Sequence, residues 1–215
     1  TAALMEATWE GFGIQNFSRL LARRKQAKKV FDDRGKFTVE LVKILAELDA
    51  KAILLFDDYG FKNGLFMSPK NFREFVFPWI SKACKAAHEH DCKIILHSDG
   101  DLTEILPDII KAGVDALNPI EPTTANPDYD IFKLKKTIGD KITLVGNISP
   151  ILLATGIIQE IEDYTLRLLR EVAPGGGYIF ASGHSINPAI PLEKYLAMLD
   201  VLKTYGKYPI ELSPN

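Results

Sequence analysis

The sequence has few of the residues that cross-link a chain or clamp a structural metal. Only two cysteines, Cys84 and Cys92, occur among its 215 residues; they lie eight positions apart, and no CxxC pair is present. This usage indicates neither a disulfide framework nor a zinc finger. We therefore expect a reduced, cytoplasmic setting.

An excess of charge of one sign is also missing. The 26 Lys and Arg residues nearly balance the 28 Asp and Glu residues, which gives a net charge of −2. A nucleic-acid-binding protein usually carries a basic excess, so we expect no nucleic acid partner. No apolar run approaches the roughly 20 residues of a membrane-spanning helix, and nothing at the start is typical of a signal peptide. We therefore expect no membrane association.

Several familiar nucleotide and nucleophile motifs are absent as well. There is no GxGxxG and no GxSxG, and the glycine-rich run 174–177 lacks a Walker lysine and precedes a strand instead of following one. The sequence therefore gives no support for a dinucleotide site, a phosphate-binding loop or a serine hydrolase.

Five short apolar runs are present, and each is typical of a parallel strand that is buried on both faces. Helical patterns separate them, with a start at Ser68-Pro69, an expected kink at Pro78 and a stop at Gly113. A capping box is predicted at 101–104. The predicted strands are 52–56, 93–96, 114–117, 142–145 and 178–181, and the predicted helices are 16–30, 37–48, 71–90, 101–112, 132–138, 157–172 and a last helix that begins at Pro191.

The alternation of strands and helices predicts an α/β fold with a parallel sheet, and the strand ends choose between two architectures. A doubly wound sheet needs polar residues only at its switch point, whereas every strand of a (β/α)8 barrel ends at one mouth. All five predicted strands end in polar residues, which favours the barrel. These residues are Asp57, Asp58 and Tyr59; His97 and Asp99; Asn118; Asn147; and Ser182 and His184.

The number of strands is smaller than a whole barrel requires. A TIM-like (β/α)8 barrel has eight strands and about 250 residues. We therefore expect residues 1–215 to form a single barrel domain with about five βα units present and three strands missing. Its open edges predict that it does not fold alone as a monomer.

His97 and Asp99 are the strongest candidates for chemistry. They lie two residues apart, so their side chains point the same way, and a carboxylate beside a histidine can orient it or share a metal. His184 ends the fifth strand in the same manner. The alternatives are a histidine that only caps its strand and a hydrogen-bonded histidine in a turn.

The neighbouring acids and amides are candidates for substrate contacts. Asp57 and Asp58 are adjacent, so they point to opposite faces, and paired acids can raise one pKa to create a proton donor. Solvated loop charge is the alternative. Asn118 and Asn147 offer amides that could orient a substrate, although asparagine is also common in turns.

The order of these segments along the chain resembles the uroporphyrinogen decarboxylase superfamily. The segments are Asp57-Asp58, His97-Ser98-Asp99-Gly100, 113–118, Gly146-Asn147-Ile148, 174–191 with Gly183-His184, and 205–208. The superfamily includes the haem-pathway decarboxylase and the cobalamin-dependent methyltransferases that supply coenzyme M. The resemblance covers essentially the whole chain and implies a TIM-like (β/α)8 barrel of which strands 4–8 are present and the N-terminal part is missing.

The leading function that this resemblance implies is decarboxylation of tetrapyrrole acetate side chains in porphyrin biosynthesis, without a cofactor. It implies a small tetrapyrrole substrate. The implied catalytic residues are His184, His97 and Asp58, and the implied substrate-binding residues are Asp57, Tyr59, Asp99, Asn118, Asn147 and Ser182.

One observation disfavours that function. A polycarboxylate substrate needs fixed cations near the mouth, but all seven arginines fall in predicted helices or in the helical N-terminal part, and only Lys62 follows a strand closely.

Two alternatives therefore stay open. In the methyltransferases that the chain resembles, His-x-Cys and a later Cys hold zinc. The corresponding ligands here are His97, Asp99 and His184, which implies a divalent metal such as zinc, a corrinoid cofactor and a corrinoid protein as partner. The second alternative is a tetrapyrrole-binding protein without catalysis. A homodimer is a further open expectation.

Overall fold

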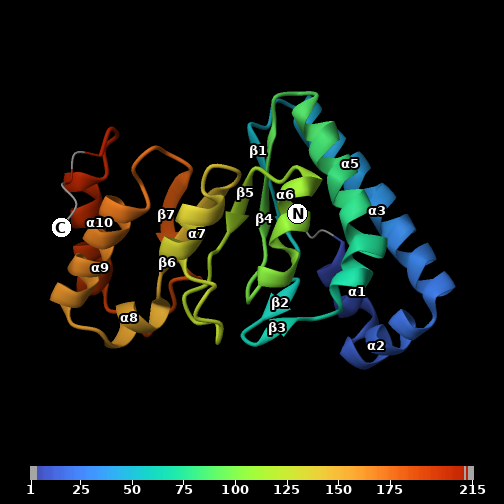
Figure 1. Cartoon of the computed structure of the whole chain (residues 1–215), viewed down its shortest axis with the longest axis horizontal. Helices are drawn as coiled ribbons and strands as arrows, with labels where there is room; N and C mark the ends of the chain where they lie inside the picture. Colours follow the sequence, from blue (N-terminus) through green and yellow to red (C-terminus); the bar gives the residue numbers. More distant parts are fainter. Residues whose placement is uncertain (1–3, 211, 213–215) are drawn as a thin grey trace. The chain divides into compact units, whose positions relative to one another are not determined.

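The chain divides into two compact units, and each is built from alternating helices and strands (Figure 1). The computed structural model describes residues 4–210 and 212. The first unit comprises residues 1–118 and the second 119–215. The expectation of a single domain over residues 1–215 stays a prediction.

The first unit carries most of the predicted strand-end residues. Its helices are α1 (Met5–Phe12), α2 (Ile14–Ala22), α3 (Arg24–Glu47), α4 (Pro69–Asn71), α5 (Phe77–His88) and α6 (Leu106–Ala112), with a π turn η1 (Phe72–Val76) and a 3-10 turn η2 (Thr103–Ile105). Its strands are β1 (Ala52–Phe56), β2 (Gly60–Phe61), β3 (Gly64–Leu65), β4 (Lys93–His97) and β5 (Ala116–Asn118).

The parallel strands β1, β4 and β5 lie side by side in that order. Their register pairs Phe56 with His97 and His97 with Asn118. The polar residues after these strands therefore meet at one edge of the sheet, because parallel strands end on the same side.

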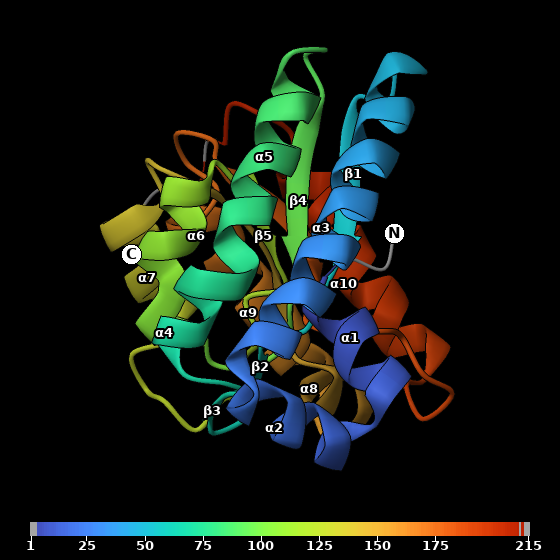
Figure 2. The same ribbon diagram turned by 90° about the vertical axis from the view of Figure 1, so that its right-hand side faces the viewer.

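Helices α3 and α5 pack against each other and run alongside β1 and β4 (Figures 1 and 2). A Cβ atom on Gly35 would lie 2.2 Å from the Trp79 ring, so glycine permits this close helix approach. The Trp79 indole N–H donates to Asp32 at 3.2 Å, and the rings of Phe31 and Phe75 stack at 5.4 Å. Buried aromatic rings thus fix the layer of helices behind the sheet.

The second unit repeats the strand–helix order. It contains α7 (Ile131–Ile138), β6 (Thr143–Ile148), α8 (Pro150–Thr155), α9 (Ile158–Glu171), β7 (Tyr178–Ser182) and α10 (Leu192–Tyr205). Strands β6 and β7 are parallel, and α9 packs against α10 (Figure 1). No described helix of either unit has the length and apolarity needed to cross a membrane.

All five predicted strands are confirmed, with bounds that differ from the prediction by at most three residues at each end. The interruption expected at Pro78 is confirmed too, and it takes the form of the π turn. Proline has no N–H to donate, and the Phe77 N–H bonds the Phe72 carbonyl five residues back.

Two helix predictions were wrong in detail. The predicted helix 16–30 is divided at Arg23, where α2 ends before α3 begins. The predicted helix 37–48 is the second half of α3, which continues through Gly35. The predicted capping box at 101–104 is a local turn, in which the Asp101 carboxylate accepts hydrogen bonds from the N–H and hydroxyl of Thr103 before the short turn η2. Helices α1 and α8 and the β2–β3 hairpin were not predicted.

Candidate functional site

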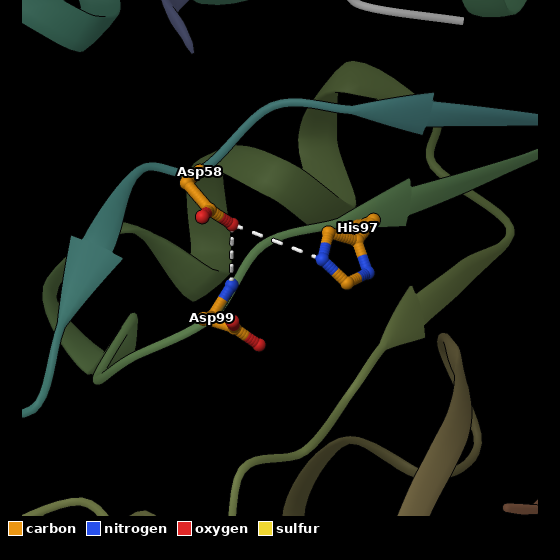
Figure 3. A group of neighbouring side chains, drawn as sticks. All are labelled: Asp58, His97 and Asp99. Carbon is orange, nitrogen blue, oxygen red and sulfur yellow. Dashed lines mark hydrogen bonds and ion pairs between the residues drawn. The ribbon is translucent and has the colours of Figure 1, made fainter. Parts of the chain in front are cut away.

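The centre of the site is a cluster of Asp58, His97 and Asp99 at the ends of β1 and β4 (Figure 3). Each residue offers one ligand atom, and these atoms all lie within 4.8 Å of one another. Asp58 Oδ1 accepts a hydrogen bond from the Asp99 backbone N–H at 2.9 Å and lies 3.9 Å from His97 Nε2. All three residues are half-buried.

Asn118 fixes the orientation of the His97 ring. His97 Nδ1 lies 2.7 Å from Asn118 Oδ1, and an amide oxygen can only accept. Nδ1 therefore carries the proton, and in the neutral ring Nε2 presents its lone pair toward Asp58. A histidine held in this way by a neighbouring acceptor is typical of metal ligands. The Phe56 ring packs 4.9 Å from the imidazole.

The His-Ser-Asp-Gly motif holds the loop that carries Asp99. Ser98 is buried; its hydroxyl accepts from the Tyr59 N–H at 2.9 Å and donates to the Asp99 carbonyl at 3.1 Å. Gly100 has φ 87°, and a Cβ there would lie 2.3 Å from the Phe61 nitrogen. Serine and glycine are thus needed for backbone geometry at these positions.

Asp57 points away from the cluster and into the start of α1. Its Oδ1 accepts the backbone N–H groups of Leu4, Met5 and Glu6 at 3.0, 2.6 and 2.8 Å. The expectation that the adjacent acids Asp57 and Asp58 face opposite sides is confirmed. Burial raises the pKa of Asp57 to about 7, against the lowering effect of these N–H groups and of the Tyr59 hydroxyl.

Tyr59 lies in the apolar layer beneath the site. Its ring packs against Phe72 and Phe77 at 5.0 and 6.2 Å, and burial raises the pKa of its hydroxyl. Neither Tyr59 Oη nor Asp57 Oδ2 makes a hydrogen bond of regular geometry with a described residue. Both residues are 0% exposed, so their substrate-binding role stays a prediction and their visible role is structural.

Glu6 is a site residue that the sequence did not indicate. Its Oε2 accepts from the Asp58 backbone N–H at 3.4 Å, and its side chain is half-buried. Burial, followed by the charge of Asp58, raises the pKa of Glu6. No motif includes it, and 52 positions separate it from Asp58, so only the fold brings the two residues together.

The second unit holds Asn147, Ser182 and His184. Asn147 is buried; its Nδ2 donates to the Ile120 carbonyl at 3.0 Å, and its Oδ1 accepts from the Tyr164 hydroxyl at 2.7 Å. The Ser182 hydroxyl donates to the His184 carbonyl at 2.6 Å. Substrate contacts by Asn147 and Ser182, and a metal-binding or catalytic role for His184, stay predictions. Tyr164 is a further partner that the sequence did not indicate.

The cluster in the first unit is suited to two kinds of chemistry. One imidazole nitrogen and two carboxylate oxygens form a ligand set that suits a divalent cation. The same groups could carry a proton, because an imidazole can both accept and donate one and the Asp58 carboxylate lies beside it.

Comparison with known proteins identifies relatives over almost the whole chain. A family model described as uroporphyrinogen decarboxylase (URO-D) matches residues 4–205. The chain is 25% identical over 174 residues to a uroporphyrinogen decarboxylase of Coxiella burnetii (strain Dugway 5J108-111), covering 79% of this chain and 45% of that protein. It is 24% identical over 208 residues to the uroporphyrinogen decarboxylase of Chloroherpeton thalassium, covering 93% of this chain and 56% of that protein. The chain thus spans about half the length of the curated relatives it matches.

A solved structure shows the same fold. The structure of a methyltransferase from Methanosarcina mazei superimposes with a TM-score of 0.71 at 23% identity, covering 91% of this chain and 54% of that one. The predicted α/β fold of the TIM-like barrel class is therefore confirmed.

Proposed function

Because this chain belongs to the uroporphyrinogen decarboxylase family, we propose that it is an enzyme that binds a divalent metal ion at Asp58, His97 and Asp99 and transfers a methyl group. The observation that carries the proposal is the His97 ring: its Nδ1 is committed to Asn118, its Nε2 lies 3.9 Å from the Asp58 carboxylate, and Asp99 completes the cluster. A corrinoid cofactor, a corrinoid protein partner and His184 as a further ligand belong to this proposal.

The residues present fit a metal of hard or borderline character. Two carboxylates and one imidazole suit zinc, manganese or a similar ion better than a soft ion. When bound, such an ion would supply Lewis acidity at the heteroatom that carries or receives the methyl group. The chain's own contribution is to hold the imidazole in one tautomer through Asn118 and to hold Asp58 through the Asp99 N–H.

Cofactor-free decarboxylation of a tetrapyrrole side chain is the second candidate. The names of the similar decarboxylases favour it, and Asp58 with His97 would serve as the proton-carrying pair. The arginines do not favour it: all seven lie on α2, α3, η1 and α9 or between α2 and α3, and none directly follows a strand of the parallel sheet.

Metal analysis of the purified protein tests the two candidates. We expect about one equivalent of divalent metal in the wild type and little in His97→Ala. His88→Ala is the matched control, because His88 pairs with Asp115 outside the cluster at 2.7 Å. A metal-free wild type that converts uroporphyrinogen anaerobically into a product with fewer carboxylates would contradict the first candidate and favour the second.

A further inference from the structure

Glu6 lies beside the cluster, on an element that the sequence did not connect with it. The carboxylate accepts the Asp58 N–H at 3.4 Å and is coupled by charge to both Asp58 and His97. It is outside the group of three ligand atoms that lie within 4.8 Å of one another. Its influence on the cluster is therefore electrostatic rather than coordinative.

Asp57 holds Glu6 in this place. Its Oδ1 accepts three successive N–H groups at the start of α1, including that of Glu6 at 2.8 Å. Since Asp57 and Asp58 are neighbours on the chain, the same strand end carries a ligand candidate on one face and anchors Glu6 on the other. This arrangement fixes the backbone that carries Glu6 close to the cluster.

We propose that Glu6 is a specificity-determining residue, which makes the Asp58–His97–Asp99 cluster selective for cations. This inference rests on the metal-binding function proposed above. Asp58 and Asp99 neutralise a divalent ion, and Glu6 adds one further negative charge next to it. Such a site favours a divalent ion, and next to that ion it favours a neutral or cationic methyl donor over a polycarboxylate.

Titration of the purified protein with Co2+ tests the inference. At low salt we expect Glu6→Gln to bind Co2+ about fivefold to tenfold more weakly than the wild type, as expected for the loss of one nearby charge at a partly solvated site. The difference should shrink in 0.5 M NaCl, where exposed charges are screened within roughly 4 Å. The visible spectrum of bound Co2+ should keep its shape, because Glu6 is not a ligand.

Two matched variants separate charge from structure. Glu10→Gln removes the same charge from an exposed position one turn farther along α1 and should bind Co2+ nearly like the wild type. Glu6→Asp keeps the charge and should recover most of the affinity. In addition, Asp57→Ala should weaken Co2+ binding, because it releases the first turn of α1, which carries Glu6. The double variant Asp57→Ala with Glu6→Gln should bind Co2+ only slightly more weakly than Asp57→Ala.

Three results would overturn the inference while leaving the metal site in place. They are a Glu6→Gln affinity within twofold of the wild type, an equal loss in Glu10→Gln, and a loss that salt does not reduce and that accompanies a lower unfolding temperature. If the folded wild type binds no Co2+ at all, the proposed metal function fails, and the inference fails with it. If Asp57→Ala does not fold, the comparison of Glu6→Gln with Glu10→Gln still decides.

Discussion

At the scale of single residues, the site depends on which atom of each side chain is committed to a partner. His97 uses Nδ1 for Asn118, so Nε2 is the nitrogen that faces the cluster. Asp58 uses Oδ1 for the Asp99 N–H, while Asp57 uses Oδ1 for α1. Two adjacent aspartates thus have different roles because a strand turns alternate side chains to opposite faces.

Removing the Asn118 oxygen that accepts the hydrogen bond from His97 Nδ1 should weaken metal binding. In Asn118→Ala the imidazole is free to change tautomer and to rotate, so we expect a loss of about 10-fold to 100-fold in Co2+ affinity. Asn118→Asp keeps an oxygen acceptor and should lose much less. Titration followed by visible absorption measures both, and wild-type affinity in Asn118→Ala would contradict the role given to Asn118.

At the scale of elements, α1 and α3 are attached to the rest of the first unit by acids. Asp57 on the end of β1 supplies the acceptor that the first turn of α1 lacks, since the N-cap position is Leu4. Asp32 in α3 accepts from the Trp79 indole of α5 and from Lys28. Asp57 accepts hydrogen bonds from backbone N–H groups that have no acceptor within α1. Asp32 accepts hydrogen bonds from two side chains, Trp79 and Lys28.

Loss of the Asp57 carboxylate should destabilise the first unit. Asp57→Ala leaves buried N–H groups without an acceptor, and we expect a loss of about 2–4 kcal/mol in the free energy of unfolding. Asp57→Asn keeps an acceptor oxygen and should lose clearly less. Urea denaturation measures the difference, and equal stability of the two variants would show that the three hydrogen bonds contribute little.

Asp32 should make the stability of the α3–α5 contact depend on acid pH. The hydrogen bond from Lys28 is the main cause that lowers the pKa of Asp32 below its ordinary value of 3.8. A lowered folded-state pKa stabilises the fold above the unfolded value, and this stability is lost as the pH falls through the folded value. We therefore expect Asp32→Asn to be less stable than the wild type by about 0.5 kcal/mol at pH 7, a small effect because the pair is partly exposed, and equally stable near pH 2.

Chemical denaturation at both pH values measures this effect. Asp33→Asn, on the exposed side of the same helix, is the control and should show no such pH dependence. A deficit of Asp32→Asn that is the same at pH 2 and pH 7 would contradict the assignment.

At the scale of the whole molecule, the first unit displays apolar side chains that a small soluble domain usually covers. Along α3, Phe37, Ile44 and Leu48 are 53%, 54% and 75% exposed, and Phe56 at the end of β1 is 43% exposed. Exposed apolar side chains of this kind can promote association where they lie together on the surface. That the chain does not fold alone as a monomer stays a prediction.

Replacing two residues of this surface should reduce self-association. We expect the wild type to show a molar mass above that of the monomer at high concentration, and Ile44→Lys with Leu48→Lys to lower it without loss of helix content. Size-exclusion chromatography with light scattering measures the mass. Lys43→Glu on the same helix is the control for a change of charge alone, and a wild type that stays monomeric at all concentrations would contradict the expectation.

The sequence by itself determined the local elements and the residues at the strand ends. The apolar run 52–56 is strand β1 with the same bounds, because the signal for a strand lies within a few residues. The expected burial on both faces was wrong for β1: Ile53 and Leu55 are buried, whereas Phe56 is 43% exposed. The Ser68 cap and the stop at Gly113 are equally local. His97, Asp99 and Asp58 were also found from the sequence, because polar residues directly after parallel strands must lie at one edge.

Only the tertiary structure decided how these residues are used. The contact of Glu6 with Asp58 spans 52 positions, that of Asp57 with Leu4 spans 53 positions, and that of His97 with Asn118 spans 21 positions. Such partners depend on strand register and on the docking of α1, which no short window of sequence encodes. The sequence therefore identified the polar side chains that follow the strands, whereas the fold decided which partners their atoms contact, because those partners come from distant parts of the chain.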